Sequence, residues 1–109
     1  MKTKILFVCT ANQQRSPTAE SLFTNNEEYE TKSVGIHPMA EIPISSEAIE
    51  WADRIVCMEE EHKEFIEREF PIADKKQLIV LNIPDVYSRD DPDLIMSLKE
   101  KLSENGIKV

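Results

Sequence analysis

Glycine is scarce in this sequence. Only Gly35 and Gly106 occur among its 109 residues, and they lie far apart. Two such glycines form neither G-x-G-x-x-G nor G-x-x-x-x-G-K-[ST], so the glycine-rich loops that bind dinucleotides or nucleoside triphosphates are excluded. Phosphate binding as such is not excluded, because backbone N–H groups of other residues also form anion-binding nests.

Cysteine is equally rare. Cys9 and Cys57 alone make neither a disulfide framework nor a four-thiolate zinc site. His37 and His62 lie far apart without metal-ligand spacing, so we predict surface histidines, no metal and no cofactor. The apolar run 5–8 is too short for a signal-peptide core or a membrane span. We therefore predict a cytoplasmic protein with free thiols.

Positive charge is in short supply. Lysine and arginine number 13 against 21 acidic residues, which gives a formal net charge of −8. We expect neither nucleic acid nor an anionic membrane as a partner, because both are bound through basic surfaces. The length fits a single domain, residues 1–109, and the 40% of hydrophobic residues is typical of a globular protein.

Apolar runs alternate with segments of helical periodicity along the chain. We predict strands over 5–8, 29–34, 54–58 and 78–81, and helices starting at 17, 46, 60 and 92. Such alternation predicts an α/β fold, a three-layer, doubly wound, four-stranded parallel sheet with flavodoxin-like strand order 2-1-3-4 and helices on both faces. Ligands of these sheets bind at the carboxyl ends of the strands.

A chemically distinctive segment, C-T-A-N-Q-Q-R-S-P, follows the first predicted strand. Its backbone N–H groups and the following helix N-terminus can converge on a tetrahedral dianion. Arg15 adds a planar fork for two phosphate oxygens, and the Cys9 thiolate is a nucleophile. Asn12 is a residue type that tolerates a left-handed backbone. We predict that Ser16 donates to the Cys9 sulfur, caps the helix before Pro17, or does both.

This segment resembles the C-x5-R-[ST] loop of the low-molecular-weight protein tyrosine phosphatases, in particular a short branch of about this length. The resemblance extends to S-V-G-I after the second strand and A-D-R-I-V-C-M at the third. It implies a phosphocysteine intermediate on Cys9, with Arg15 binding phosphate. The loop residues expected to bind phosphate are Thr10, Ala11, Asn12, Gln13, Gln14 and Arg15.

A general acid is expected after the fourth strand. The family places it in a D-P-Y element, which Asp85-Val86-Tyr87 resembles with valine for proline. We predict Asp85 as the acid and Tyr87 as a wall of the substrate cleft. Asp91, followed by Pro92, is the competing candidate, although an N-cap of the last helix also explains it.

The sequence departs from the family pattern at four places. Ala11 stands where glycine is usual, and Gln13 replaces the isoleucine or threonine that helps to select the substrate. Gln14 replaces a second cysteine, so a redox switch is not expected. The segment between the second and third strands is short, which predicts a shallow, open site.

These features predict a hydrolase for a phosphorylated protein or a small phosphomonoester, most directly a tyrosine phosphatase. Two alternatives stay open. One is a non-catalytic module that binds phosphate or another oxyanion. The other is an arsenate reductase, for which Cys57, in the middle of a predicted strand, is poorly placed as a relay.

Overall fold

A computed structural model describes residues 2–109 of the chain. The elements in chain order are β1 (Thr3–Cys9), α1 (Arg15–Ser21), β2 (Tyr29–Gly35), α2 (Ser46–Trp51), β3 (Arg54–Cys57), α3 (Glu60–Glu69), a 3₁₀ helix η1 (Pro71–Lys75), β4 (Gln77–Val80) and α4 (Pro92–Glu104). Strands and helices therefore alternate as the sequence predicts.

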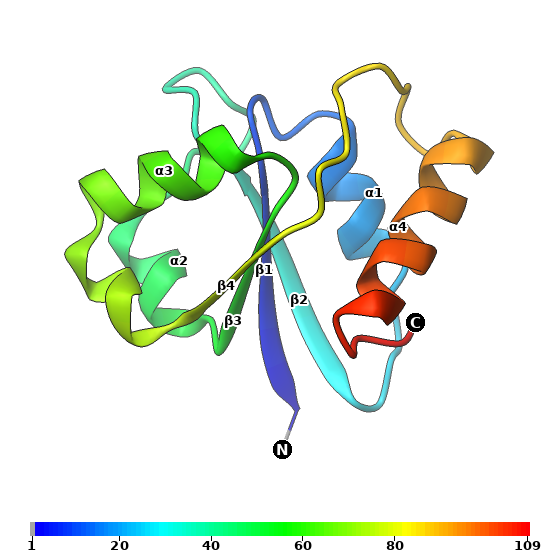
Figure 1. Cartoon of the computed structure of the whole chain (residues 1–109), viewed down its shortest axis with the longest axis horizontal. Coiled ribbons are helices and arrows are strands. Elements are labelled where there is room, and N and C mark those ends of the chain that lie inside the picture. Colours follow the sequence, from blue (N-terminus) through cyan, green and yellow to red (C-terminus); the bar gives the residue numbers. More distant parts are fainter. Residues whose placement is uncertain (1) are drawn as a thin grey trace.

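The four strands form one parallel sheet with the order β2-β1-β3-β4, which confirms the predicted fold class and strand order. Helices α1 and α4 lie on one side of the sheet, and α2 and α3 on the other (Figure 1). Residues 5–8 of the central strand β1 are fully buried, because helices cover both faces. That burial explains why the run is continuously apolar instead of alternating.

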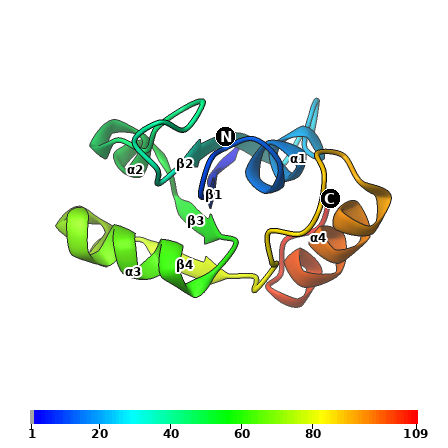
Figure 2. The ribbon, with the colours of Figure 1, turned by 90° about the horizontal axis from the view of Figure 1, so that it is seen from above.

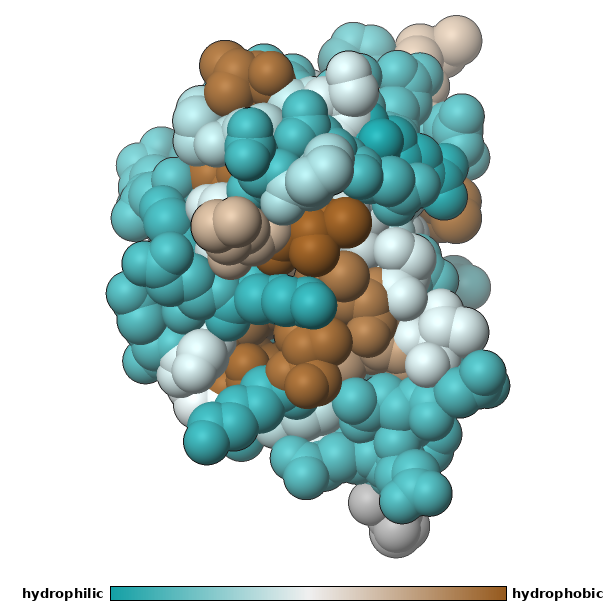
Figure 3. Space-filling view, turned by 90° about the vertical axis from the view of Figure 1, so that its right-hand side faces the viewer, coloured by the Kyte–Doolittle hydropathy of each residue, from teal (hydrophilic) through white to brown (hydrophobic). Residues whose placement is uncertain are grey.

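Two apolar clusters lie on the two faces of β1. Phe7 packs with Phe23 and Leu98 on the side of α1 and α4, whereas Leu6 and Ile66 belong to the cluster under α2 and α3. Figure 3 shows apolar side chains gathered at the middle of one face, surrounded by hydrophilic residues. No helix within residues 2–109 has both the length and the apolarity needed to cross a membrane.

Two helix starts test the capping predictions. Helix α4 begins at Pro92, and the Asp91 side chain accepts a hydrogen bond from the Asp93 N–H, as an N-cap does. Helix α1 begins at Arg15, earlier than predicted, and its N-cap Gln14 makes no side-chain capping bond. The prediction of Ser16 as a cap was therefore wrong, because its hydroxyl is engaged beside Cys9 instead.

The loops after β1 and before α4 lie at the same end of the molecule, where all four strands have their carboxyl ends (Figures 1 and 2). Met58 N–H donates to the Val8 carbonyl, and Ile83 N–H donates to the Met58 carbonyl. The segments that follow β1, β3 and β4 are thus joined directly, and they bring together the residues described next.

Candidate active site

The loop from Cys9 to Arg15 curls back on the cysteine sulfur. Asn12 has a left-handed backbone, with φ of 57°. This conformation directs the Asn12 N–H to the Cys9 Sγ at a distance of 3.2 Å. A single left-handed residue of a type that tolerates it therefore closes the loop without a glycine.

Several backbone N–H groups of the loop remain free. Those of Ala11, Gln13 and Gln14 make no hydrogen bond to any other group within residues 2–109. A small cavity of about 80 Å³ lies beside them and is lined by Cys9, Ala11, Gln13, Gln14, Arg15 and Asp85. Free N–H groups around a small cavity with a nucleophilic sulfur suit a tetrahedral oxyanion.

Hydrogen bonds orient the Ser16 hydroxyl toward Cys9. The Asn12 side-chain amide donates to Ser16 Oγ at 2.9 Å and to Ser33 Oγ at 3.0 Å. Ser16 Oγ, which accepts from Asn12, lies 2.9 Å from Cys9 Sγ and 3.4 Å from the Val34 carbonyl oxygen, so the sulfur is the nearer of the two acceptors for the single hydroxyl hydrogen.

Arg15 is held by one end of its guanidinium group. Its side chain is 2% exposed, and Nη1 donates to the Glu59 carboxylate and to the Ile83 carbonyl oxygen, the latter at 2.8 Å. Both hydrogens of Nη1 are thereby used. The opposite edge, formed by Nε and Nη2, stays available to two oxygens of one phosphate, with Thr10 Oγ1 at 3.5 Å from Nη2.

Sequence reasoning missed Glu59 and misplaced His62. Glu59 was not predicted as a site residue, but its carboxylate pairs with Arg15. His62 was predicted at the surface, yet its side chain is fully buried. The available signal was its spacing: the third residue of a helix is the position whose side chain reaches back to the N-cap N–H. His62 Nδ1 accepts from the Glu59 N–H at 3.0 Å in this way.

His62 also contacts the phosphate loop. Because Nδ1 accepts a hydrogen bond, the proton of the neutral ring resides on Nε2, which donates to Thr10 Oγ1 at 3.0 Å. Burial is the main cause that lowers the pKa of His62 from 6.5 to about 4. The Arg15 charge lowers this pKa further, whereas Glu59 and Asp85 oppose the shift. The imidazole is therefore neutral near pH 7, and its two hydrogen bonds connect the start of α3 to Thr10 of the loop.

The low pKa of His62 predicts an acid-sensitive fold. Between pH 6.5 and about 4 the unfolded chain binds a proton at His62 that the folded protein does not bind, so stability falls as the pH falls through this window. The loss attributable to this group is up to about 3 kcal/mol. Chemical unfolding measured over this pH range should show a shallower slope for His62→Gln. The exposed His37 supplies the control, His37→Gln, whose slope should match wild type; equal slopes for all three proteins would contradict the prediction.

The two candidate acids lie in different places. Asp85 lines the cavity beside Cys9 and is 59% exposed, with Oδ1 3.8 Å from Arg15 Nε. Asp91 Oδ1 instead accepts from a backbone N–H at the start of α4. Tyr87 is half-buried and packs against the apolar cluster on the side of α1 and α4, and it is not among the residues that line the cavity.

The structure contains two further candidate groups, the second thiol at Cys57 and the cluster of Glu59, Glu61 and His62. Burial raises the pKa of Cys57 to about 12, and this thiol is the last residue of β3 instead of lying in mid-strand as predicted. Glu59, Glu61 and His62 bring potential ligand atoms within 4.8 Å of one another. Since Glu59 pairs with Arg15 and both nitrogens of His62 form hydrogen bonds, this cluster has few ligand atoms left for a cation.

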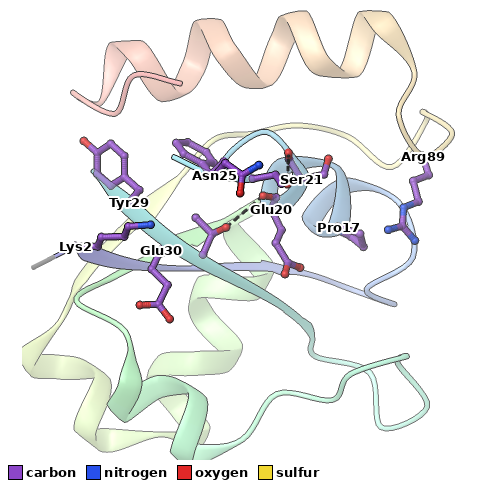
Figure 4. Close-up of a pocket in the computed structure, with 11 residues that line it drawn as sticks. Lys2, Pro17, Glu20, Ser21, Asn25, Tyr29, Glu30 and Arg89 are labelled. Atoms are coloured by element: carbon purple, nitrogen blue, oxygen red, sulfur yellow. Dashed lines mark hydrogen bonds between the residues drawn. The ribbon is translucent and has the colours of Figure 1, made fainter. Parts of the chain in front are cut away.

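A wider hollow of about 440 Å³ lies away from Cys9, along α1 and β2 (Figure 4). Its walls include Pro17, Glu20, Tyr29 and Arg89, with none of the residues around the cysteine sulfur. Neither cysteine of the chain lines this hollow. The smaller cavity beside Cys9 is therefore the candidate active site.

Gly35, the last residue of β2, packs directly against the loop between β1 and α1. A Cβ atom at this position would lie 2.6 Å from the Thr10 carbonyl oxygen and 2.9 Å from the Asn12 nitrogen. Both are backbone atoms of the loop, so they cannot move aside as a flexible side chain would. A residue without a side chain is required where the loop crosses the end of β2.

The structure is similar to solved structures of phosphatases. The tyrosine phosphatase Wzb from Escherichia coli K30, in complex with phosphate, superposes with a TM-score of 0.74 at 24% identity, over 95% of this chain and 96% of that chain. YwlE arginine phosphatase from Geobacillus stearothermophilus gives 0.70 at 25% identity, over 94% and 92%. A low-molecular-weight protein tyrosine phosphatase from T. tengcongensis gives 0.67 at 22%, over 95% and 99%. This chain has the fold of the low-molecular-weight protein tyrosine phosphatases.

The predicted resemblance is thus confirmed over most of the chain, with Cys9 and Arg15 positioned as in a phosphate loop. No protein-family model and no curated protein matches the sequence. The assignment to the phosphatase fold therefore depends on structural similarity and on the geometry of the loop between β1 and α1.

Proposed function

We propose that the protein is a cysteine-dependent phosphomonoester hydrolase of the low-molecular-weight tyrosine phosphatase type. The observation that carries the proposal is the pair of donors on one sulfur: the Asn12 N–H at 3.2 Å and the Ser16 hydroxyl at 2.9 Å from Cys9 Sγ. A buried structural thiol such as Cys57 has no comparable set of donors among the described residues. These donors favour an anionic nucleophile.

In the first step, Cys9 Sγ attacks phosphorus as the bond to the leaving oxygen breaks. The free N–H groups of the loop and the Nε–Nη2 edge of Arg15 stabilise the charge on the equatorial oxygens. Asp85 donates a proton to the leaving oxygen, which departs as an alcohol or phenol. The product is a phosphocysteine.

In the second step, water attacks the phosphocysteine and the S–P bond breaks. The carboxylate of Asp85 accepts a proton from that water, since the same group that acts as acid in one direction acts as base in the next step. Phosphate is released, and Cys9 returns as the thiolate under the Ser16 hydroxyl. Every proton lost in the first step is regained in the second.

The substrate class proposed is an aryl phosphate, with phosphotyrosine in a protein as its natural form. The similarity to the tyrosine phosphatase Wzb supports this choice. The open cavity, with exposed Gln13 and Asp85 at its edge, admits a phosphorylated side chain presented by another protein. We place the protein in the cytoplasm, because the mechanism needs the free thiol of Cys9.

Asp85→Asn should reduce the hydrolysis of phenyl phosphate by about 10² to 10⁴-fold, because the amide has no proton to give to the phenolate. Asp91→Asn should stay within a few-fold of wild type, because asparagine is also a good N-cap. Steady-state kinetics on phenyl phosphate, phosphotyrosine peptide and phosphoarginine checks both variants and the substrate class together.

Three outcomes of this experiment would decide against parts of the proposal. A large loss in Asp91→Asn with wild-type rates in Asp85→Asn would exchange the two acids. Preference for phosphoarginine would replace the substrate class, in line with the similarity to YwlE arginine phosphatase. Binding of inorganic phosphate without turnover of any substrate would favour a non-catalytic oxyanion-binding module.

A further inference from the structure

The side chain of Gln14 reaches from the start of α1 to the loop that carries the proposed acid. One end of its amide faces two acceptors, Asp85 Oδ1 at 3.3 Å and the Tyr87 carbonyl oxygen at 3.2 Å. Only the amide nitrogen can donate to both, so this end is the nitrogen, and each of its two hydrogens has one partner. Gln14 thereby holds two points of the loop between β4 and α4.

The main chain of Gln14 provides a second connection to the same loop. The Thr18 hydroxyl donates to the Gln14 carbonyl oxygen at 2.6 Å and accepts from the Asp90 N–H at 3.0 Å. Thr18 is fully buried, and Asp90 has a left-handed backbone with φ of 62°. Residues 85–90 are therefore attached to the first turn of α1 at both ends, even though Asp85 itself is exposed.

We infer that Gln14 is a positioning residue that orients the Asp85 carboxyl group so that Oδ2 carries the transferred proton. This inference builds on the proposed function. Gln14 Nε2 and Arg15 Nε both face Oδ1, at 3.3 Å and 3.8 Å. Oδ2 makes no hydrogen bond within residues 2–109.

An oxygen that accepts an N–H and lies near a guanidinium is not the one that carries the proton of a carboxylic acid. The proton of the acid form therefore resides on Oδ2. In the first step Oδ2 gives this proton to the leaving oxygen as the P–O bond breaks. In the second step it takes one from water as the S–P bond breaks, while Oδ1 keeps the same hydrogen bond to Gln14 throughout.

The test compares Gln14→Ala with wild type on two substrates that differ in their need for an acid. p-Nitrophenolate leaves readily without a proton, whereas phenolate does not. Gln14→Ala should lower kcat for phenyl phosphate by about 10 to 100-fold and for p-nitrophenyl phosphate by only a few-fold. In an Asp85→Asn background the same change should have no selective effect, because the group that Gln14 orients is gone.

Gln14→Glu provides a second readout. The new carboxylate would lie beside Asp85 and oppose loss of its proton, so the alkaline limb of the kcat/KM profile should move to higher pH. The other titratable groups near Asp85 are Cys9, Arg15, Glu59 and His62, none of which this substitution alters. The limb should move only if the side chain at position 14 lies beside the Asp85 carboxyl group, as the 3.3 Å contact of Gln14 requires.

Gln77 is the matched control, because it is an exposed glutamine of β4, outside the cavity. Gln77→Ala and Gln77→Glu should reproduce the wild-type rates and pH profile. Equal losses on both substrates in Gln14→Ala, or an unmoved alkaline limb in Gln14→Glu, would overturn the role of Gln14 alone. No turnover by the wild-type protein would instead overturn the proposed function and this inference with it.

Discussion

Replacement of Cys9 with serine is expected to abolish hydrolysis, with kcat lower by about four orders of magnitude or more. A serine hydroxyl is a far weaker nucleophile than a thiolate, and the donors that favour a sulfur anion do not ionise an alcohol at neutral pH. Turnover of phenyl phosphate by equal amounts of wild type and Cys9→Ser measures the loss.

Binding should survive this substitution. The anion is held by loop N–H groups and by Arg15, none of which Cys9→Ser removes, so inorganic phosphate should bind within about tenfold of wild type by calorimetry. Cys57→Ala is the control for loss of a thiol, and its activity should be that of wild type at temperatures below unfolding. Equal activity of wild type and Cys9→Ser would refute the phosphocysteine mechanism.

Arg15→Lys is expected to lower kcat/KM by about 10³-fold or more, although the charge is kept. Arg15 performs two tasks at once: Nη1 is bound to Glu59 and to the Ile83 carbonyl, and the other edge of the fork is free for phosphate. A lysine has one nitrogen at the end of a flexible chain, so it can pair with Glu59 or with phosphate but cannot present a planar edge to the phosphate.

Steady-state kinetics with phenyl phosphate, together with thermal unfolding, checks this expectation. The melting temperature should change little, because the lysine still pairs with the Glu59 carboxylate. The exposed Arg89 supplies the control Arg89→Lys, which should keep wild-type kinetics. Wild-type kcat/KM in Arg15→Lys would mean that the fork of Arg15 does not bind the transferred phosphoryl group.

The fold could be predicted from the sequence because each strand and helix has a pattern that spans only a few adjacent residues. A continuous apolar run such as 5–8 is required where a strand is covered on both faces, and that requirement can be read from four adjacent residues. The start of α1 was misplaced by two residues for a related reason. Ser16 and Pro17 look like a cap and a first helical residue, but the hydroxyl of Ser16 forms a hydrogen bond with Cys9 and does not cap the helix.

The candidate site was predictable where its residues are close in sequence. Cys9, Asn12, Arg15 and Ser16 belong to one loop, so their types and spacing already suggest an oxyanion site. Other contacts join residues far apart in the chain. The pairing of Arg15 with Glu59 depends on the register of β1 against β3, which no local pattern specifies.

The amide of Gln14 could not be assigned from sequence for the same reason. Its partners lie after β4, and they come within reach only because the loops at the carboxyl ends of β1 and β4 converge. The sequence therefore predicted a role for Gln14 only through its backbone N–H group, as part of the phosphate-binding loop. The side chain has partners that depend on the whole fold, since β3 lies between β1 and β4 in the sheet and six elements separate these two strands in the sequence.

The close approach of Gly35 has a mechanical consequence. No side chain separates the loop from the end of β2, so the Thr10 carbonyl and the Asn12 nitrogen lie directly on backbone. The loop is therefore packed directly against the hydrogen-bonded sheet, with no intervening side chain that could change its rotamer. We therefore expect the sulfur and the N–H groups to keep their mutual distances before phosphate binds. The scarce glycine serves here to allow close packing of backbone on backbone and not to allow bending.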